Sequence, residues 1–227
     1  MTGRVSPALR MLVIVLAGAI ALAVVVPGVK RHQAAQAGVL TTSDGDTVDV
    51  TRAARAAGPV FAADMPAADR AWVRAALASA RPEAARLIAE VDGLVRFSVF
   101  SGGPDAPLGV TRSHERGFDV SFNVAQLDGR HAYDRPTVVL HELGHVVDFA
   151  LVPRALNQQL DAAIPRGGAC GAAIDCDRIE ERFADTFAKW ALHGAVSAAG
   201  AGYGIAAPPS LEDWGAPLGA LAVTLPA

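Results

Sequence analysis

Two segments of the chain alternate apolar and polar residues, which is the pattern of a half-buried β-strand. The first covers residues 95–99 and the second residues 118–124. Residues 101–109, between them, are rich in Gly and Pro and predict a loop. Nearer the N-terminus, residues 39–50 predict a hairpin that turns at Asp44-Gly45. These patterns predict a small mixed or antiparallel sheet.

Three other segments carry apolar residues at helical spacing. Residues 69–92 show this pattern, and within them Pro82 suits a first helical position while Gly93 is a plausible C-cap. A second helix is predicted over residues 134–152, where Pro153 stops it, and a third over residues 178–193. Strands and helices in one chain without repeats predict an α+β fold.

The domain organisation follows from length and pattern. The chain has 227 residues, enough for one domain of ordinary size with an appendage. We find no second core segment, so residues 39–227 are predicted to form a single domain. Its last part, residues 206–223, is interrupted by Pro and Gly, and we expect it to lie on the surface.

The N-terminal region predicts a membrane segment. Residues 11–29 contain no charged residue and are long enough to cross a bilayer as a helix. We therefore expect residues 1–32 to be a signal anchor, followed by a tether over residues 33–38, in a single-pass protein of the cell membrane. Cleavage near Ala37, with secretion of the rest, is the alternative.

Charge and cysteine content refine this picture. The net charge of −3 and the absence of a basic cluster beyond the N-terminal region give no indication of a nucleic-acid partner. The two cysteines, Cys170 and Cys176, would form a short disulfide in an oxidising compartment. Free thiols and metal ligands are the other interpretations, although a second cysteine pair is absent. An extracytoplasmic domain with a loop disulfide agrees best with the membrane segment.

The predicted helix over residues 134–152 contains the sequence His141-Glu142-Leu143-Gly144-His145. Residues four apart lie on one face of a helix, so His141 and His145 can bind one ion. Glu142 lies beside them and can reach a water molecule on that ion. This is the pattern of zinc metallopeptidases, in which two imidazoles bind zinc and a carboxylate is the general base. Chance placement on an exposed helix face is the alternative.

A third ligand is expected because catalytic zinc has three protein ligands. Glu181, in the predicted helix over residues 178–193, shares a face with Asp185. The opposite face carries aromatic residues suited to the core, Phe183, Phe187 and Trp190. This division directs Glu181 toward the helix predicted over residues 134–152. A solvated acidic helix start is the alternative.

The two segments HELGHVVD and ERFADTF together resemble the gluzincin metallopeptidases, and are most like the lethal-factor-type catalytic domain. The resemblance covers residues 134–190. It implies a zincin-like fold, in which one helix carries the paired histidines and a later helix carries the ligand glutamate.

By position, the resemblance implies one Zn²⁺ ion bound by His141, His145 and Glu181, with Glu142 as the base. It makes Asp185 the carboxylate that orients a ligand imidazole. Asp148 lies seven residues after His141, a turn beyond His145, so we expect a supporting or ion-pairing role for it rather than a ligand role.

This chain departs from the family at one position. Lethal-factor-type enzymes have a tyrosine about two turns before the ligand glutamate, where it assists the oxyanion, and this chain has Ile174 there. Tyr133, His131 and Tyr203 are the candidates to replace it, although the sequence positions none of them and favours a surface or packing role for each. Zinc alone could also stabilise the charge.

The resulting hypothesis is an endopeptidase acting on protein or peptide substrates. Zinc would lower the pKa of its bound water toward ~7, and Glu142 would accept the proton and deliver it to the departing amine. We expect residues 118–127 to form an edge strand that binds extended peptide, with Ser121 and Asn123 in contact with it. A non-catalytic zinc-binding module and a zinc amidohydrolase acting on a non-peptide substrate are the alternatives; the presence of Glu142 favours an enzyme.

Overall fold

The computed structural model describes residues 58–131, 133–166, 178–194 and 204–225, together with the backbone of residues 39–41 and 47–49. The expected anchor and tether, residues 1–38, lie outside these ranges. Among the helices within them, none has the length and apolar character needed to span a membrane.

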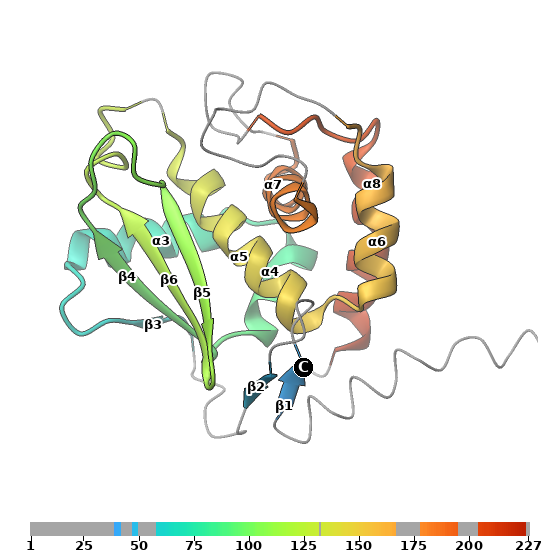
Figure 1. The fold of residues 1–227 in the computed structure, drawn as a ribbon, viewed down its shortest axis with the longest axis horizontal. Helices are drawn as coiled ribbons and strands as arrows, with labels where there is room; N and C mark the ends of the chain where they lie inside the picture. The colour runs from blue at the N-terminus through green and yellow to red at the C-terminus, as the bar shows by residue number, and fades with distance from the viewer. Residues whose placement is uncertain are drawn as a thin grey trace, which may run out of the picture.

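Four strands form a mixed sheet in the order β3-β4-β6-β5 (Figure 1). They are β3 (Val60–Phe61), β4 (Val95–Phe100), β5 (Gly109–His114) and β6 (Gly117–Asn123). β3, β4 and β6 run parallel, whereas β5 is antiparallel to β6 and forms one edge. The alternation predicted for β4 and β6 is confirmed, because the core-facing residues are buried: Val95, Phe97, Phe118, Val120 and Phe122.

A separate antiparallel pair joins β1 (Val39–Thr41) to β2 (Thr47–Asp49). This pairing agrees with the hairpin predicted over residues 39–50. Its turn lies outside the described residues.

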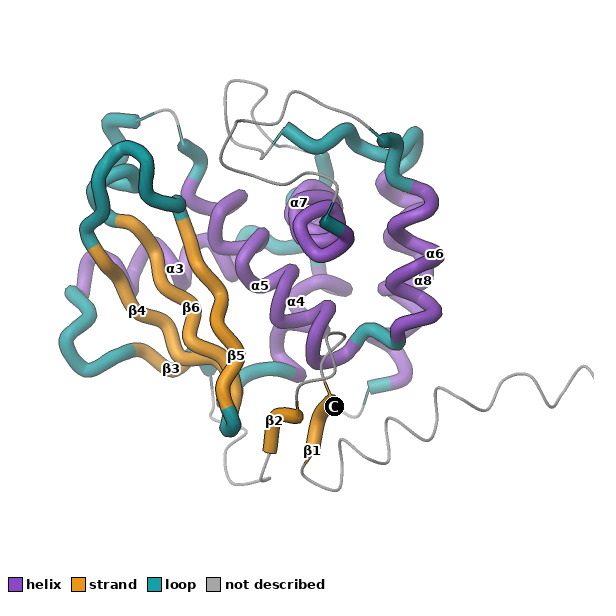
Figure 2. The backbone as a smooth tube through the Cα atoms, viewed as in Figure 1, coloured by secondary structure: helices purple, strands orange, loops and turns teal. Residues whose placement is uncertain are grey.

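Six helices are described: α3 (Ala67–Ala78), α4 (Pro82–Glu90), α5 (Arg135–Leu151), α6 (Arg154–Ala163), α7 (Ile179–Ala191) and α8 (Leu211–Thr224). α5 lies between the sheet and α7, and α6 and α8 lie beyond α7 (Figure 2). The described residues therefore form a mixed α/β structure with a small mixed sheet. This agrees with the prediction of strands and helices in one domain.

The boundaries of α5 follow from its sequence. Asp134 is the N-cap, and its carboxylate accepts hydrogen bonds from the Thr137 amide at 3.0 Å and the Thr137 hydroxyl at 2.6 Å. Pro136 occupies the first turn, where no amide donor is needed, and the helix ends just before Pro153. The helix predicted over residues 134–152 is confirmed. α7 likewise confirms the helix predicted over residues 178–193.

The helical pattern over residues 69–92 divides into two helices, α3 and α4. Pro82 begins α4, as predicted, because proline lacks the amide that a continuous helix would need there. Residues 79–81 form the break between them.

The expected surface role of residues 206–223 is wrong. Ser210 caps α8 by accepting a hydrogen bond from the Asp213 amide at 3.1 Å, and Trp214 and Leu218 are buried. Pro217 costs the helix about 3 kcal/mol. Burying two large apolar side chains stabilises it by about 1.5–3 kcal/mol each, which offsets that cost.

The expected edge position of the strand over residues 118–127 is also wrong. β6 pairs with β4 on one side and with β5 on the other, so no edge of β6 is free for a peptide. The edge strands of this sheet are β5 and β3. The tight turn of β5 into β6 depends on Gly117, which has φ +150° and whose missing Cβ would lie 2.2 Å from the Leu94 carbonyl oxygen.

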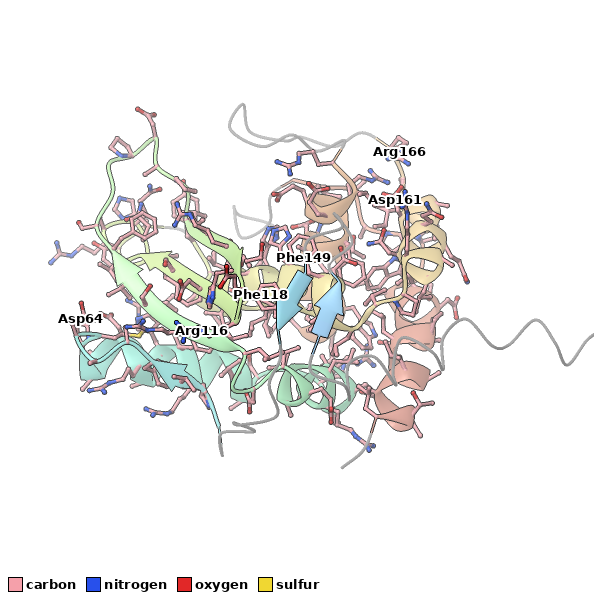
Figure 3. All side chains as sticks on the ribbon, turned by 60° about the horizontal axis from the view of Figure 1, so that its bottom comes forward. Asp64, Arg116, Phe118, Phe149, Asp161 and Arg166 are labelled. Atoms are coloured by element: carbon pink, nitrogen blue, oxygen red, sulfur yellow. The ribbon has the colours of Figure 1, made fainter. Side chains whose placement is uncertain are left out.

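A buried arginine joins α6 to α7. The Arg182 guanidinium donates to the Asp161 carboxylate at 2.6 Å and to the Ile164 carbonyl at 2.6 Å, beyond the last turn of α6. Arg166 donates to the second oxygen of Asp161 at 2.7 Å, and the Asp161–Arg166 pair lies at the end of α6 (Figure 3). The charge of Arg182 is thus paired, and it fixes one side of α7.

Candidate metal centre

Three potential metal ligands from two helices meet in the core. His141 and His145 come from α5, and Glu181 comes from the first turn of α7. The two Nε2 atoms are 3.2 Å apart, and the Glu181 carboxylate oxygens lie 3.3 Å from His141 Nε2 and 3.8 Å from His145 Nε2. The structure therefore brings together the three residues that the sequence indicated as ligands.

The close approach of α5 and α7 depends on Gly144. A Cβ at this position would lie 2.8 Å from the Ala184 Cα and 3.1 Å from its carbonyl oxygen, both on the backbone of α7. The aromatic side of α7 is buried as predicted, including Phe183 and Phe187. The predicted facing of Glu181 is thus confirmed.

Burial keeps both histidines neutral. His141 is 1% exposed, and burial lowers its pKa from 6.5 to about 3, although the negative charge of Asp185 opposes this effect. The pKa of His145 is also lowered to about 3, mainly by burial. Neutral imidazoles have a lone pair available for a metal ion. Glu181 is less enclosed, with 22% of its side chain exposed.

The spacing fits one small divalent ion. Metal–ligand bonds of about 2.0–2.2 Å in a tetrahedral arrangement place the ligand atoms about 3.3–3.6 Å apart. The three observed separations of 3.2, 3.3 and 3.8 Å are close to that range. Two neutral imidazoles and one carboxylate are also a ligand set that divalent transition metals accept. His141, His145 and Glu181 are therefore a candidate metal site.

Glu142 is buried against the edge strand. The Thr111 hydroxyl lies 2.8 Å from its Oε2 atom, and Gly109 packs directly against the carboxylate. No sequence pattern pointed to these two residues, because β5 was itself not predicted. The role of Glu142 as a base stays a prediction.

The two supporting carboxylates occupy different surroundings. Asp185 is fully buried and paired with Lys189, whose ammonium group also donates to the Ile205 carbonyl. Its orientation of a ligand imidazole stays a prediction. Asp148 accepts a hydrogen bond from Asn157 at 2.7 Å, which ties α5 to α6.

Two of the candidate oxyanion groups lie among the described residues, and their recorded contacts are with each other and with Asp128. His131 and Tyr133 are exposed in the loop before α5, where their rings stack and His131 contacts Asp128 at 3.1 Å. Tyr203 lies outside the described residues, as does Ile174. Cys170 and Cys176 lie there too, so their predicted disulfide stays a prediction.

Ser121 and Asn123 make hydrogen bonds within the sheet and to the loop before β5, respectively. The Ser121 hydroxyl hydrogen-bonds that of Ser98 on β4 at 2.7 Å. Asn123 is buried, and its side chain accepts from the Gly102 amide at 3.0 Å and donates to the Pro107 carbonyl at 3.3 Å. Asn123 therefore fixes the loop that leads into β5, which corrects its expected contact with substrate.

We expect Asn123→Ala to lower the free energy of unfolding by about 1–3 kcal/mol, because buried polar groups of the loop lose their partner. Urea unfolding of the two proteins measures this difference. Ser121→Ala, which removes a hydroxyl from the same strand, is the control and should cost no more than about 1.5 kcal/mol. Equal losses in the two variants would contradict the loop-anchoring role.

The comparisons with known proteins add no relative. No protein-family model, curated protein or solved structure matches this chain. The resemblance to gluzincins therefore rests on the two motifs alone and stays a prediction.

Proposed function

We propose that the chain is a zinc-dependent endopeptidase of the gluzincin type with a zincin-like fold. The observation that carries the proposal is the convergence of His141, His145 and Glu181, with the buried Glu142 directly after His141 in the chain. The motif supplies two ligands and the base, and the separate helix α7 supplies the third ligand. This combination is more specific than the five-residue motif alone.

The chain's own residues would divide the work of hydrolysis. Zinc bound by the three ligands would acidify a water molecule and polarise the substrate carbonyl. Glu142 would accept a proton from that water as the water oxygen attacks the carbonyl carbon. Glu142 would then donate that proton to the amide nitrogen as the C–N bond breaks, giving a carboxylic acid and an amine.

Strand β5 replaces β6 as the proposed binding site for the peptide. Among the described strands, β5 has one edge that pairs with no other strand. An extended peptide could add to this edge through main-chain hydrogen bonds, as in β-augmentation. β5 also contacts α5, which carries Glu142, so a peptide on this edge would lie close to the base.

The proposed location is extracytoplasmic, on a single-pass anchor. Its support is the uncharged segment over residues 11–29 and the cysteine pair, Cys170 and Cys176. Release by cleavage near Ala37 is the alternative.

One observation favours a second candidate function, a zinc-binding module without catalysis. Ile174 stands where lethal-factor-type enzymes have the tyrosine that assists the oxyanion. An amidohydrolase acting on a non-peptide amide would use the same ligands and base.

The test uses the full-length protein, purified in detergent and loaded with zinc, together with Glu142→Gln. We expect one zinc per chain in both proteins and cleavage of a peptide library by the parent only, with a loss of about 10²–10⁴-fold in the variant. Zinc without cleavage by the parent would support the binding module or the non-peptide substrate. A folded parent that binds no zinc would refute the metal site.

A further inference from the structure

The carboxylate of Glu142 occupies a space formed by one face of β5. The Thr111 hydroxyl lies 2.8 Å from Glu142 Oε2 and 3.1 Å from the main-chain oxygen of the same residue. A Cβ on Gly109 would lie 2.5 Å from Glu142 Oε1 and 2.6 Å from its Cγ. Alternate residues of a strand point to the same side, so Gly109 and Thr111 both face the Glu142 carboxylate.

We propose that Thr111 is a positioning residue for Glu142, and that Gly109 provides the space in which the Glu142 carboxylate lies. This inference rests on the proposed function, because it takes Glu142 to be the base. The Thr111 hydroxyl donates to Oε2 and so holds the carboxylate in one orientation. Oε1 is then the oxygen that accepts the proton from the attacking water.

The precision of this placement matters for the chemistry. A general base acts on a proton within about 2.6–3.2 Å, and a displacement of about 1 Å can cost as much as 10²-fold in rate. Glu142 has a flexible side chain, whereas Thr111 is β-branched and stiff about χ1. A rigid donor on a paired strand therefore limits the positions of the mobile carboxylate.

A purely structural role is the competing explanation for Thr111. Its hydroxyl can also donate to the main-chain oxygen of Glu142 and so join β5 to α5. In that case removal of the hydroxyl would lower stability without a specific effect on kcat. The two explanations differ in the kinetic constant that changes.

The experiment compares Thr111→Val, Thr111→Ser and Gly109→Ala in the full-length, zinc-loaded protein, with a library peptide that the parent cleaves. Thr111→Val keeps the shape and removes the hydroxyl, and we expect a loss of about tenfold in kcat with KM changed less than about twofold. Thr111→Ser should restore kcat to within about twofold of the parent. Gly109→Ala should lose about 10²-fold in kcat. All three variants should retain one zinc.

Thr224→Ala is the control, since it removes an exposed hydroxyl from α8, outside β5 and the candidate metal site, and it should leave kcat unchanged. Unchanged kcat in Thr111→Val, or an equal loss in Thr111→Ser, would overturn the inference. If the parent cleaves no peptide, the proposed function fails. Crystal structures of the parent and of Thr111→Val then decide the inference: a displaced Glu142 carboxylate supports it and an unmoved one refutes it.

Discussion

Glu181→Gln is expected to abolish the proposed zinc binding and, with it, the proposed hydrolytic activity. An amide oxygen is a much weaker ligand than a carboxylate, and the two histidines alone leave the ion with two protein ligands instead of three. The loss of affinity should exceed the roughly 10–100-fold that the removal of an outer-shell partner costs. Competition with a chromophoric chelator measures the affinity.

Glu180→Gln is the control for Glu181→Gln. Both glutamates lie in the first turn of α7 and both carry a charge that raises the pKa of His145, so each variant loses the same charge near the site. The Glu180 carboxylate accepts a hydrogen bond from Arg178 at 2.7 Å, and Glu180 does not belong to the three-residue cluster. Its variant should keep one zinc per chain. Equal zinc affinity in the two variants would show that Glu181 is not a ligand.

Gly144→Ala is expected to destabilise the protein and to weaken zinc binding, although alanine is the better helix former. The helix would gain up to about 1 kcal/mol from the substitution. The added methyl group meets the Ala184 backbone at 2.8 Å, and relief of such overpacking typically costs about 1–3 kcal/mol. Separation of α5 from α7 would also move Glu181 away from the histidines. Urea unfolding and chelator competition measure the two effects.

Gly219→Ala in α8 provides the matched comparison. The nearest atom to an added Cβ there is Glu83 Cγ at 3.6 Å, an ordinary contact. This variant should gain about 0.5–1 kcal/mol of stability and bind zinc unchanged. If Gly144→Ala proved as stable as Gly219→Ala, the close approach of α5 and α7 would not restrict the size of the side chain at position 144.

The parts of the site that could be predicted are marked by short-range sequence patterns. α5 has an N-cap, a proline in its first turn and a proline just after its end, so its bounds follow from the sequence. The i, i+4 spacing of His141 and His145 then fixes their common face. Glu181 could be assigned because the buried aromatic residues of α7 determine which side of that helix faces α5.

The parts that were missed depend on contacts between distant segments. β5 has few large apolar residues, and its turn, Glu115-Arg116, lacks the glycine or asparagine typical of two-residue hairpin turns. The order of the strands is also not local, since β4 pairs with β6 and not with β5, the next strand in the chain. Without β5, neither the edge of the sheet nor the partners of Glu142 could be inferred.

The burial of α8 limits where the domain tolerates shortening or insertion. Trp214 contacts Phe183 and Trp190 on α7 with ring centroids 5.7 and 6.5 Å apart, and Glu212 of α8 pairs with Arg81 at the start of α4. A chain that ended before Ser210 would expose an aromatic surface on the helix that carries Glu181, and exposed surfaces of this kind promote aggregation. Truncations that are meant to keep the candidate metal site should therefore end after α8 rather than before it.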